Sequence, residues 1–146
     1  MFEKLIEGVV ISDEPFSCLC FNKTSLNEIK RYIQNEPDKT EAGGLLIGYR
    51  RSNHFEITHI TTPKLFDVRQ KFLFERRDNT HIRILKKLKK TNKDISYLGE
   101  WHTHPEEIPS PSNIDLSQWQ TCKNNSTNVL LFIIFGTKEP YIKSYF

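Results

Sequence analysis

The order of apolar and polar positions predicts a chain in which strands and helices are mixed. Segments 8–12 and 16–21 have strand character and flank a turn at 13–15. Segment 25–35 keeps its apolar residues at helical spacing, and Ser25 with Glu28 fits a capping box, so we expect a helix there. An apolar strand over 42–50 and an alternating strand over 54–62 are expected to form a hairpin across 51–53.

The second half of the chain continues this mixture. We expect an amphipathic helix over 79–92, an alternating strand over 95–104, and a helix that opens at Ser112 and runs to about Lys123. Segment 128–136 is the most apolar, which favours a central strand, and 141–146 closes the chain as a strand. Segment 63–77 is ambiguous between a loop and a short strand. The pattern indicates an α+β or three-layer fold around a mixed sheet.

Length and composition fit a globular protein. The 146 residues contain no repeat and no linker, so 1–146 is expected to be a single domain. The net charge of +3 is mild and does not by itself require nucleic acid or a membrane surface. The absence of a long apolar run and of a signal-peptide pattern predicts a cytoplasmic protein. The three cysteines have no paired spacing, and Cys18 and Cys20 are interpreted as small buried residues rather than as part of a disulfide framework.

Candidate chemistry is concentrated in "GEWHTHPEEIPSPSNID", residues 99–115. His102 and His104 are two residues apart on the predicted strand, so both imidazoles point to the same side, about 7 Å apart at the backbone. Pro105 ends the strand and leaves His104 at its rim. Two imidazoles so placed can converge on one metal ion.

A carboxylate follows the histidines after a stiff turn. Pro109 and Pro111 restrict this turn, and Ser112 is a favourable helix N-cap. Asp115 then lies in the first helical turn, where the helix dipole favours an ionised carboxylate. Two histidines, one aspartate and an open position form the ligand set of a catalytic zinc ion. The simpler alternative is a strand end with two solvent-facing histidines and an ordinary capping box.

The spacing H-x-H-x7-S-x2-D, together with "TEAGGLLIG" at 40–48, resembles the JAMM (MPN-plus, or JAB) metallopeptidase motif. The form of the motif is similar to that of small bacterial JAB-type isopeptidases, which are encoded beside ubiquitin-activating-like and ubiquitin-conjugating-like enzymes in CBASS antiviral operons. The resemblance extends over about residues 8–135, with its specific motifs at 41–48 and 99–119. It implies a three-layer α-β-α sandwich around a mostly antiparallel, curved sheet of the cytidine-deaminase-like type.

The resemblance also implies roles for individual residues. His102, His104 and Asp115 would bind one Zn²⁺ per chain. Glu41 would be the general base, and Ser112 would help to hold the oxyanion. These roles together describe hydrolysis of an amide by an activated water, without a covalent intermediate.

Other residues near the motif carry weaker expectations. Gly43 and Gly44 are expected to permit close approach of a substrate strand or of backbone, and Trp101 to form a wall that contacts substrate. Glu100 shares the histidines' face of the strand and is the rival candidate for the base. Glu106 and Glu107 are interpreted as solvated turn charges.

The function implied by the resemblance is cleavage of an amide or isopeptide bond after the extended C-terminal tail of a ubiquitin-like modifier, or of a protein conjugated in the same way, in antiviral defence. One alternative is a peptidase that trims a sulfur-carrier protein or a small peptide. Two others lie outside enzymes: a scaffold without metal, and a nucleic-acid binder that uses the basic segment 83–90.

Overall fold

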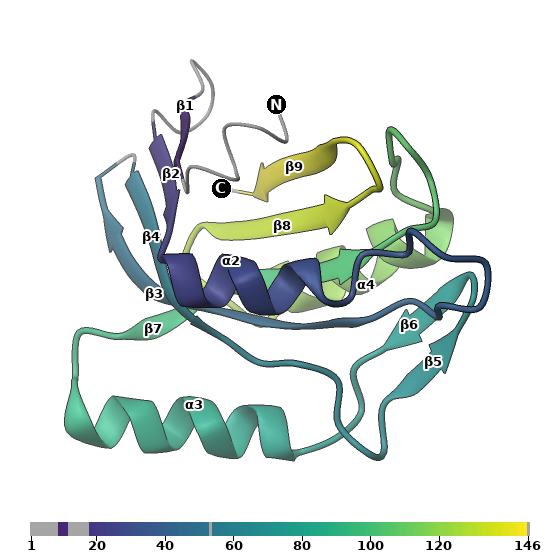
Figure 1. Ribbon diagram of the computed structural model, residues 1–146. Coiled ribbons are helices and arrows are strands. Elements are labelled where there is room, and N and C mark those ends of the chain that lie inside the picture. Colours follow the sequence, from purple (N-terminus) through teal and green to yellow (C-terminus); the bar gives the residue numbers. More distant parts are fainter. Residues whose placement is uncertain (1–8, 12–17, 53, 146) are drawn as a thin grey trace.

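The computed structural model describes residues 9–11, 18–52 and 54–145. Within these ranges seven strands form one sheet in the order β1-β2-β4-β3-β7-β8-β9 (Figure 1). In that order the strands are Val9–Ile11, Cys18–Phe21, His54–Ile60, Gly43–Arg51, Ser96–Thr103, Leu130–Phe135 and Pro140–Tyr145. Neighbouring strands are antiparallel except for the parallel pairs β2–β4 and β7–β8, so the predicted mixed, mostly antiparallel sheet is confirmed.

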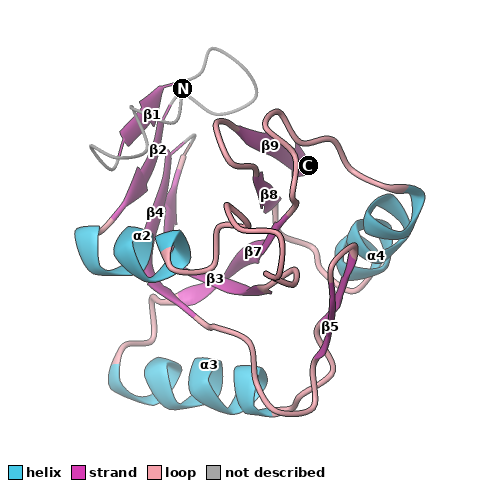
Figure 2. Cartoon of the chain, turned by 45° about the vertical axis from the view of Figure 1, so that its right-hand side comes forward, coloured by secondary structure: helices cyan, strands magenta, loops and turns pink. Residues whose placement is uncertain are grey.

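Helices cover both faces of this sheet, as the three-layer prediction requires. Helix α2 (Lys23–Lys30) lies on one face, whereas α3 (Thr80–Thr91) and α4 (Asn113–Asn124) lie on the other (Figure 2). Both α3 and α4 match the predicted helices to within one residue at each end. Among the described residues, no helix is both long and apolar enough to cross a membrane.

Strand β8 shows why the two faces form separate apolar layers. Its side chains alternate between the layers: Leu131, Ile133 and Phe135 pack on the α2 side, while Leu130, Phe132 and Ile134 pack against α4. The prediction that this strand is central is wrong, because β8 is next to last and β3 is the middle strand. A strand covered on both faces is apolar throughout wherever it lies in the sheet.

Helix α2 begins earlier than its sequence pattern predicts. The cap is Asn22, whose side-chain oxygen accepts the backbone N–H of Ser25 at 2.9 Å. Ser25 is therefore inside the first turn, and its hydroxyl donates to Thr58 O at 3.3 Å. The predicted capping box of Ser25 and Glu28 is wrong because asparagine caps a helix as well as serine does.

The ambiguous segment 63–77 contains a hairpin. Strands β5 (Val68–Gln70) and β6 (Leu73–Glu75) form a separate two-stranded sheet. The hairpin is joined to the chain just before β3, because Glu41 N–H donates to Gln70 O at 2.8 Å and Arg69 Nε donates to Glu41 O at 2.9 Å. It therefore lies beside the residues that precede the glycine-rich strand.

A bulge divides β7 into two parts. The register against β3 shifts between Leu46 and Ile47, and Gly99 at this point has φ +142°, a backbone conformation that favours glycine. A Cβ atom on Gly99 would collide with the carbonyl oxygen of Leu131 on β8. Beyond the bulge, Trp101 faces the α2 layer and His102 faces the α4 side.

The remaining predictions follow the same order along the chain. The pairing of 8–12 with 16–21 is confirmed as the antiparallel pair β1–β2, while the turn at 13–15 lies outside the described residues. The hairpin of β3 and β4 is also confirmed. Cys18, Cys20 and Cys122 are free, as expected, but they are half-buried and not buried.

Candidate metal centre

His102 and His104 converge at the end of β7. His102 is the penultimate residue of the strand, and His104 follows it, with its N–H donating to Phe135 O on β8 at 3.1 Å. Both side chains are buried, and their Nε2 atoms lie 3.1 Å apart. The period of the strand therefore brings the two imidazoles to one point, as the sequence predicts.

Asp115 reaches the same point from the start of α4. Ser112 caps this helix: its Oγ accepts the N–H of Asp115 at 3.1 Å, while Asp115 Oδ2 accepts the N–H of Ser112 at 2.8 Å. The predicted capping box is thus confirmed. Its aspartate also faces the histidines, with Oδ1 3.3 Å from His102 Nε2 and Oδ2 3.1 Å from His104 Nε2.

These distances fit a tetrahedral ion. Zinc is bound by imidazole nitrogen and carboxylate oxygen at about 2.0–2.2 Å, so neighbouring ligand atoms around it are separated by about 3.3 Å. The Nε2 atoms of His102 and His104 are 3.1 Å apart, and they lie 3.3 and 3.1 Å from the two different oxygens of Asp115, Oδ1 and Oδ2. The donor set and its spacing are therefore compatible with a zinc site.

Glu41 lies at the edge of the same cluster. Its Oε2 is 4.0 Å from His104 Nε2, and the side chain is almost wholly buried. Its ligand atom also lies within 4.8 Å of those of His102 and His104, so proximity alone would admit Glu41 as a third ligand. The shorter distances favour Asp115 as the third ligand. Glu41 lies farther away, at a distance that one water molecule could bridge.

Burial and charge set the protonation of this cluster. Burial raises the pKa of Glu41 to about 7, against the opposing attraction of His104. Burial by itself lowers the pKa of His104, but hydrogen bonds to Asp115 and Glu106 outweigh it and raise this pKa to about 9. Burial by itself raises the pKa of Asp115, but hydrogen bonds from both histidines outweigh burial and hold this pKa well below its usual range. At neutral pH a proton is held among these groups unless a cation takes its place.

Glu106 has a role that the sequence analysis missed. Its Oε1 accepts from His104 Nδ1 at 2.8 Å, so the interpretation as a solvated turn charge is wrong for this residue. Metal-binding histidines usually donate their second N–H to such an acceptor, which fixes the ring and its tautomer. Glu107 does match the interpretation, because its side chain is 67% exposed and its carboxylate pairs with the equally exposed Lys138. A lone glutamate in a turn gives no periodic signal that would separate the two.

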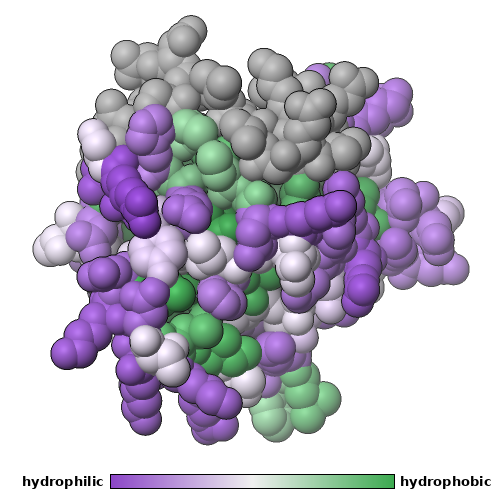
Figure 3. Space-filling view, turned by 60° about the vertical axis from the view of Figure 1, so that its left-hand side comes forward, coloured by the Kyte–Doolittle hydropathy of each residue, from purple (hydrophilic) through white to green (hydrophobic). Residues whose placement is uncertain are grey.

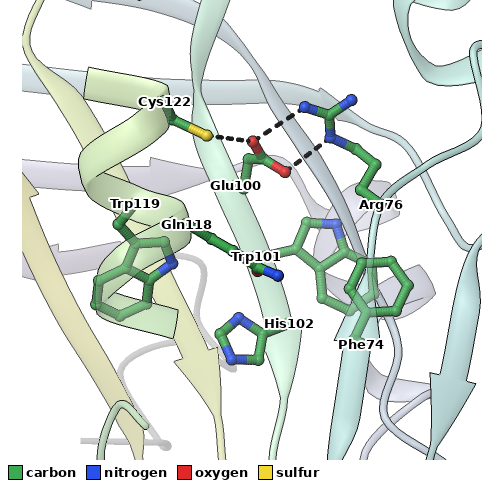
Figure 4. Close-up of a pocket in the computed structure, with 8 residues that line it drawn as sticks. All are labelled: Phe74, Arg76, Glu100, Trp101, His102, Gln118, Trp119 and Cys122. Atoms are coloured by element: carbon green, nitrogen blue, oxygen red, sulfur yellow. Dashed lines mark hydrogen bonds and ion pairs between the residues drawn. The ribbon is translucent and has the colours of Figure 1, made fainter. Parts of the chain in front are cut away.

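Glu100 lies on the expected face but is directed away from the histidines (Figure 4). Its carboxylate accepts two bonds from Arg76, at 2.8 and 3.2 Å, and further bonds from Tyr97 at 2.9 Å and Cys122 at 3.1 Å. Burial, followed by the charge of Glu100, raises the pKa of Cys122 to about 12, so this thiol stays protonated as a donor. The cluster joins β7 to α4 and to the chain after β6.

The residues that were expected to contact substrate instead lie against other parts of the protein. These residues are Gly43, Gly44 and Trp101. A Cβ atom on Gly43 would lie 2.6 Å from Trp101 O and 2.6 Å from the ring of Phe74, and one on Gly44 would collide with Thr61 O. Trp101 is 1% exposed, and its indole N–H donates to Thr61 O at 3.0 Å. The close backbone approach is therefore between strands of the protein itself, and Trp101 packs in the core.

A cleft opens beside the cluster. Its volume is about 420 Å³, which is within the range of ligand sites. The wall formed by the β5–β6 turn carries Phe72, which is 74% exposed. The loop after β7 supplies another part of the lining. The cleft is lined by Glu41, Phe72, His104, Pro105, Glu106, Ser110, Pro111 and Ser112.

Comparison with known proteins assigns the chain to a family. A family model described as prokaryotic homologs of the JAB domain matches residues 24–146. The chain belongs to this family. The fold of this JAB protein is also similar to the solution structure of protein DSY2949 from Desulfitobacterium hafniense, with a TM-score of 0.60 at 21% identity over 86% of this chain and 82% of that one.

Three curated relatives of this JAB protein carry the name CD-NTase/cGAS isopeptidase. The protein from Pseudomonas aeruginosa strain BWHPSA011 is 36% identical over 135 residues, which cover 90% of this chain and 85% of the relative. The protein from Escherichia coli strain TW11681 is 41% identical over 115 residues, covering 78% and 73%. The protein from Vibrio cholerae serotype O1 is 37% identical over 135 residues, covering 92% and 86%.

Proposed function

We propose that this protein is a zinc-dependent isopeptidase that releases a CD-NTase-type protein from an amide conjugate in CBASS antiviral defence. The observation that carries the proposal is the buried cluster of His102, His104, Asp115 and Glu41, in a JAB-family chain whose relatives are named isopeptidases. We assign His102, His104 and Asp115 as the ligands of one Zn²⁺.

The residues around the ligands support hydrolysis by water. Zinc, when bound, acidifies a water molecule and polarises a carbonyl group. Glu41 accepts the proton of the attacking water at its carboxylate and later delivers it to the leaving amine, a task that suits a carboxyl whose pKa is about 7 before a cation is added. A bound cation would lower this pKa and keep the carboxylate ready to accept a proton.

Ser112 is placed to assist at the carbonyl oxygen. Its side chain lines the cleft beside Glu41 and His104. In the structure its Oγ accepts from Asp115 N, which leaves the hydroxyl hydrogen free to donate to a developing oxyanion. The same hydroxyl therefore serves as helix cap and as oxyanion donor. Phe72 supplies an apolar surface for the chain that precedes the scissile bond.

Two substitutions separate the roles of the carboxylates. The substrate is a CD-NTase-type protein joined through its C-terminal carboxyl to a lysine of a target protein, and cleavage is followed by gel electrophoresis and mass spectrometry. Glu41→Gln should lose at least about 10²-fold in rate and keep its zinc, because the amide cannot accept a proton. Asp115→Asn should lose both activity and zinc affinity, because a charged ligand is removed.

The outcome that contradicts the proposal is equally specific. Wild-type protein that holds no zinc after incubation with the ion, or zinc-loaded protein that leaves the conjugate intact, would refute the isopeptidase assignment. Loss of zinc in Glu41→Gln with zinc retained in Asp115→Asn would exchange the two roles.

A further inference from the structure

Two large apolar side chains project from the loop between β4 and β5. Leu65 is 86% exposed and its neighbour Phe66 is 72% exposed. A single exposed apolar residue is common on a protein surface. Two adjacent exposed apolar residues need an explanation when the loop that carries them is fixed. A mobile loop could turn them inward, whereas this loop cannot.

The loop is fixed by a buried carboxylate. Asp67 Oδ2 lies 2.6 Å from Nε2 of His81, which is fully buried on α3, and accepts the backbone N–H of Lys64 at 2.8 Å. Asp78 Oδ2 accepts the N–H of Phe66 at 3.0 Å. Turning Leu65 or Phe66 inward would break bonds to buried charged groups, which is costly. The fold therefore holds both side chains in the solvent.

A hollow lies beside the two apolar side chains. Its volume is about 470 Å³, and it shares no lining residue with the cleft at the metal centre. The apolar part of the lining is Leu65 and Phe66. The polar part includes Arg77, Asp78 and Arg83; Arg77 pairs with Glu75, so Arg83, on α3, is the cation of this lining that forms no ion pair within the described residues. The hollow thus combines apolar contact area with positive charge.

Helix α3 extends the positive charge from this hollow. Arg83, Lys86, Lys87 and Lys90 recur at spacings of three and four residues and are all exposed, so they form one basic face. The helix contains no acidic residue, and its lysines and Arg83 form no ion pair with any carboxylate in the described part of the chain. Like charges at this spacing destabilise a helix. In Figure 3, strongly hydrophilic side chains project from the lower part of the molecule, where Figure 1 places α3, with hydrophobic side chains exposed among them.

We infer that Leu65, Phe66 and the basic face of α3 form a docking surface for an acidic protein segment that carries apolar side chains. The apolar residues of that segment contact Leu65 and Phe66, and its carboxylates face Arg83, Lys86 and Lys87. A protein fits this surface better than a nucleic acid does, because Leu65 can neither stack on a base nor bond to a phosphate. The inference is independent of the hydrolytic reaction and concerns how the protein finds a partner.

Fluorescence polarisation with the full chain tests the surface directly. The probe is a short fluorescein-labelled peptide in which glutamates surround a leucine and a phenylalanine. Two matched peptides carry glutamine for glutamate, or serine for the apolar residues, and a labelled oligothymidine tests nucleic acid. The acidic apolar peptide should bind most tightly, and its affinity should fall as salt is added, because exposed charges are screened.

Two double variants and one control locate the binding. Arg83→Glu with Lys87→Glu, and Leu65→Ser with Phe66→Ser, should each weaken binding by about tenfold or more. Lys23→Glu with Arg31→Glu makes the same charge change on the exposed side of α2, across the sheet, and should have little effect. Thermal unfolding confirms that each variant is folded.

Each other outcome overturns the inference. Equal weakening by the α2 control would mean that binding is only non-specific attraction. Tighter binding of oligothymidine, lost in the α3 variant, would assign the surface to nucleic acid. If the acidic apolar peptide does not bind at low salt, the proposed docking surface is refuted. Because zinc content and conjugate cleavage are not read out here, none of these results bears on the proposed hydrolysis.

Discussion

Replacing Glu106 by alanine tests whether a turn residue tunes the metal centre. The substitution removes the acceptor of the His104 Nδ1–H, which in the native protein is bonded at 2.8 Å. The imidazole then loses the contact that fixes its orientation and its tautomer, and with them the direction of Nε2 towards the metal site. We expect weaker zinc binding with an unchanged fold.

The structure sets the size of this effect. Loss of a partner that orients a metal ligand typically costs about 10- to 100-fold in metal affinity. The Glu106 side chain is 47% exposed, so water can replace part of the lost bond. The expected loss is therefore near the lower end, about tenfold, or about 1.4 kcal/mol. Glu106→Gln should lose less, because its amide oxygen can still accept from Nδ1.

Glu107→Ala is the matched control, because it removes the same charge one residue further along. Its carboxylate pairs with Lys138 at 3.2 Å and makes no contact with a histidine. Zinc affinity is measured by competition with a chromophoric chelator, with thermal unfolding as the check on folding. Equal losses for the two alanine variants would refute the reasoning, since only a general charge effect would remain.

Three further predictions concern the fold around the centre. Chelation of zinc should leave a cooperatively folded protein, because the ligand-bearing elements pack in apolar clusters; loss of helical circular dichroism on chelation would contradict this. Glu100→Ala leaves Arg76 without its acceptor, and urea unfolding should show a loss of about 2–4 kcal/mol; a loss below about 1 kcal/mol would show that water replaces the pair. Asp67 has a lowered pKa because hydrogen bonds from Asp78 N and His81 outweigh burial, so its contribution is present above about pH 4 and is lost as pH falls through the lowered value. Asp67→Asn should therefore flatten the acid side of a profile of unfolding temperature against pH, and an unchanged slope would argue against it.

The sequence was most informative where a local period carries the geometry. The two-residue spacing of His102 and His104 and the three-residue spacing of Ser112 and Asp115 each follow from a strand or a helical turn. Contacts between distant segments could not be predicted in this way. Arg76 and Glu100 are 24 positions apart and meet only because β6 lies near β7.

Strand order and helix caps also could not be predicted from the sequence pattern, for physical reasons. An apolar sequence indicates that a strand is covered on both faces, but it does not indicate which strands lie beside it. The prediction of a central position for β8 was wrong for this reason. Two nearby residues that can both cap a helix, such as Asn22 and Ser25 at the start of α2, compete by fractions of a kcal/mol that composition does not resolve.

The bulge at Gly99 has a consequence for how this protein can change in length. It separates the part of β7 that packs against α3 from the part that carries His102, and each part has its own alternation of faces. Removing one residue at the bulge would restore regular pairing with β3 and leave His102 and His104 on their present side. Removing one residue after the bulge would turn the side chains between the bulge and the deletion to the opposite face of the sheet. A change of length between Glu100 and His104 would therefore disturb the alternation that places the two histidines, whereas a change at the bulge is limited by the buried side chain of Leu98 and by the close approach of Gly99 to Leu131.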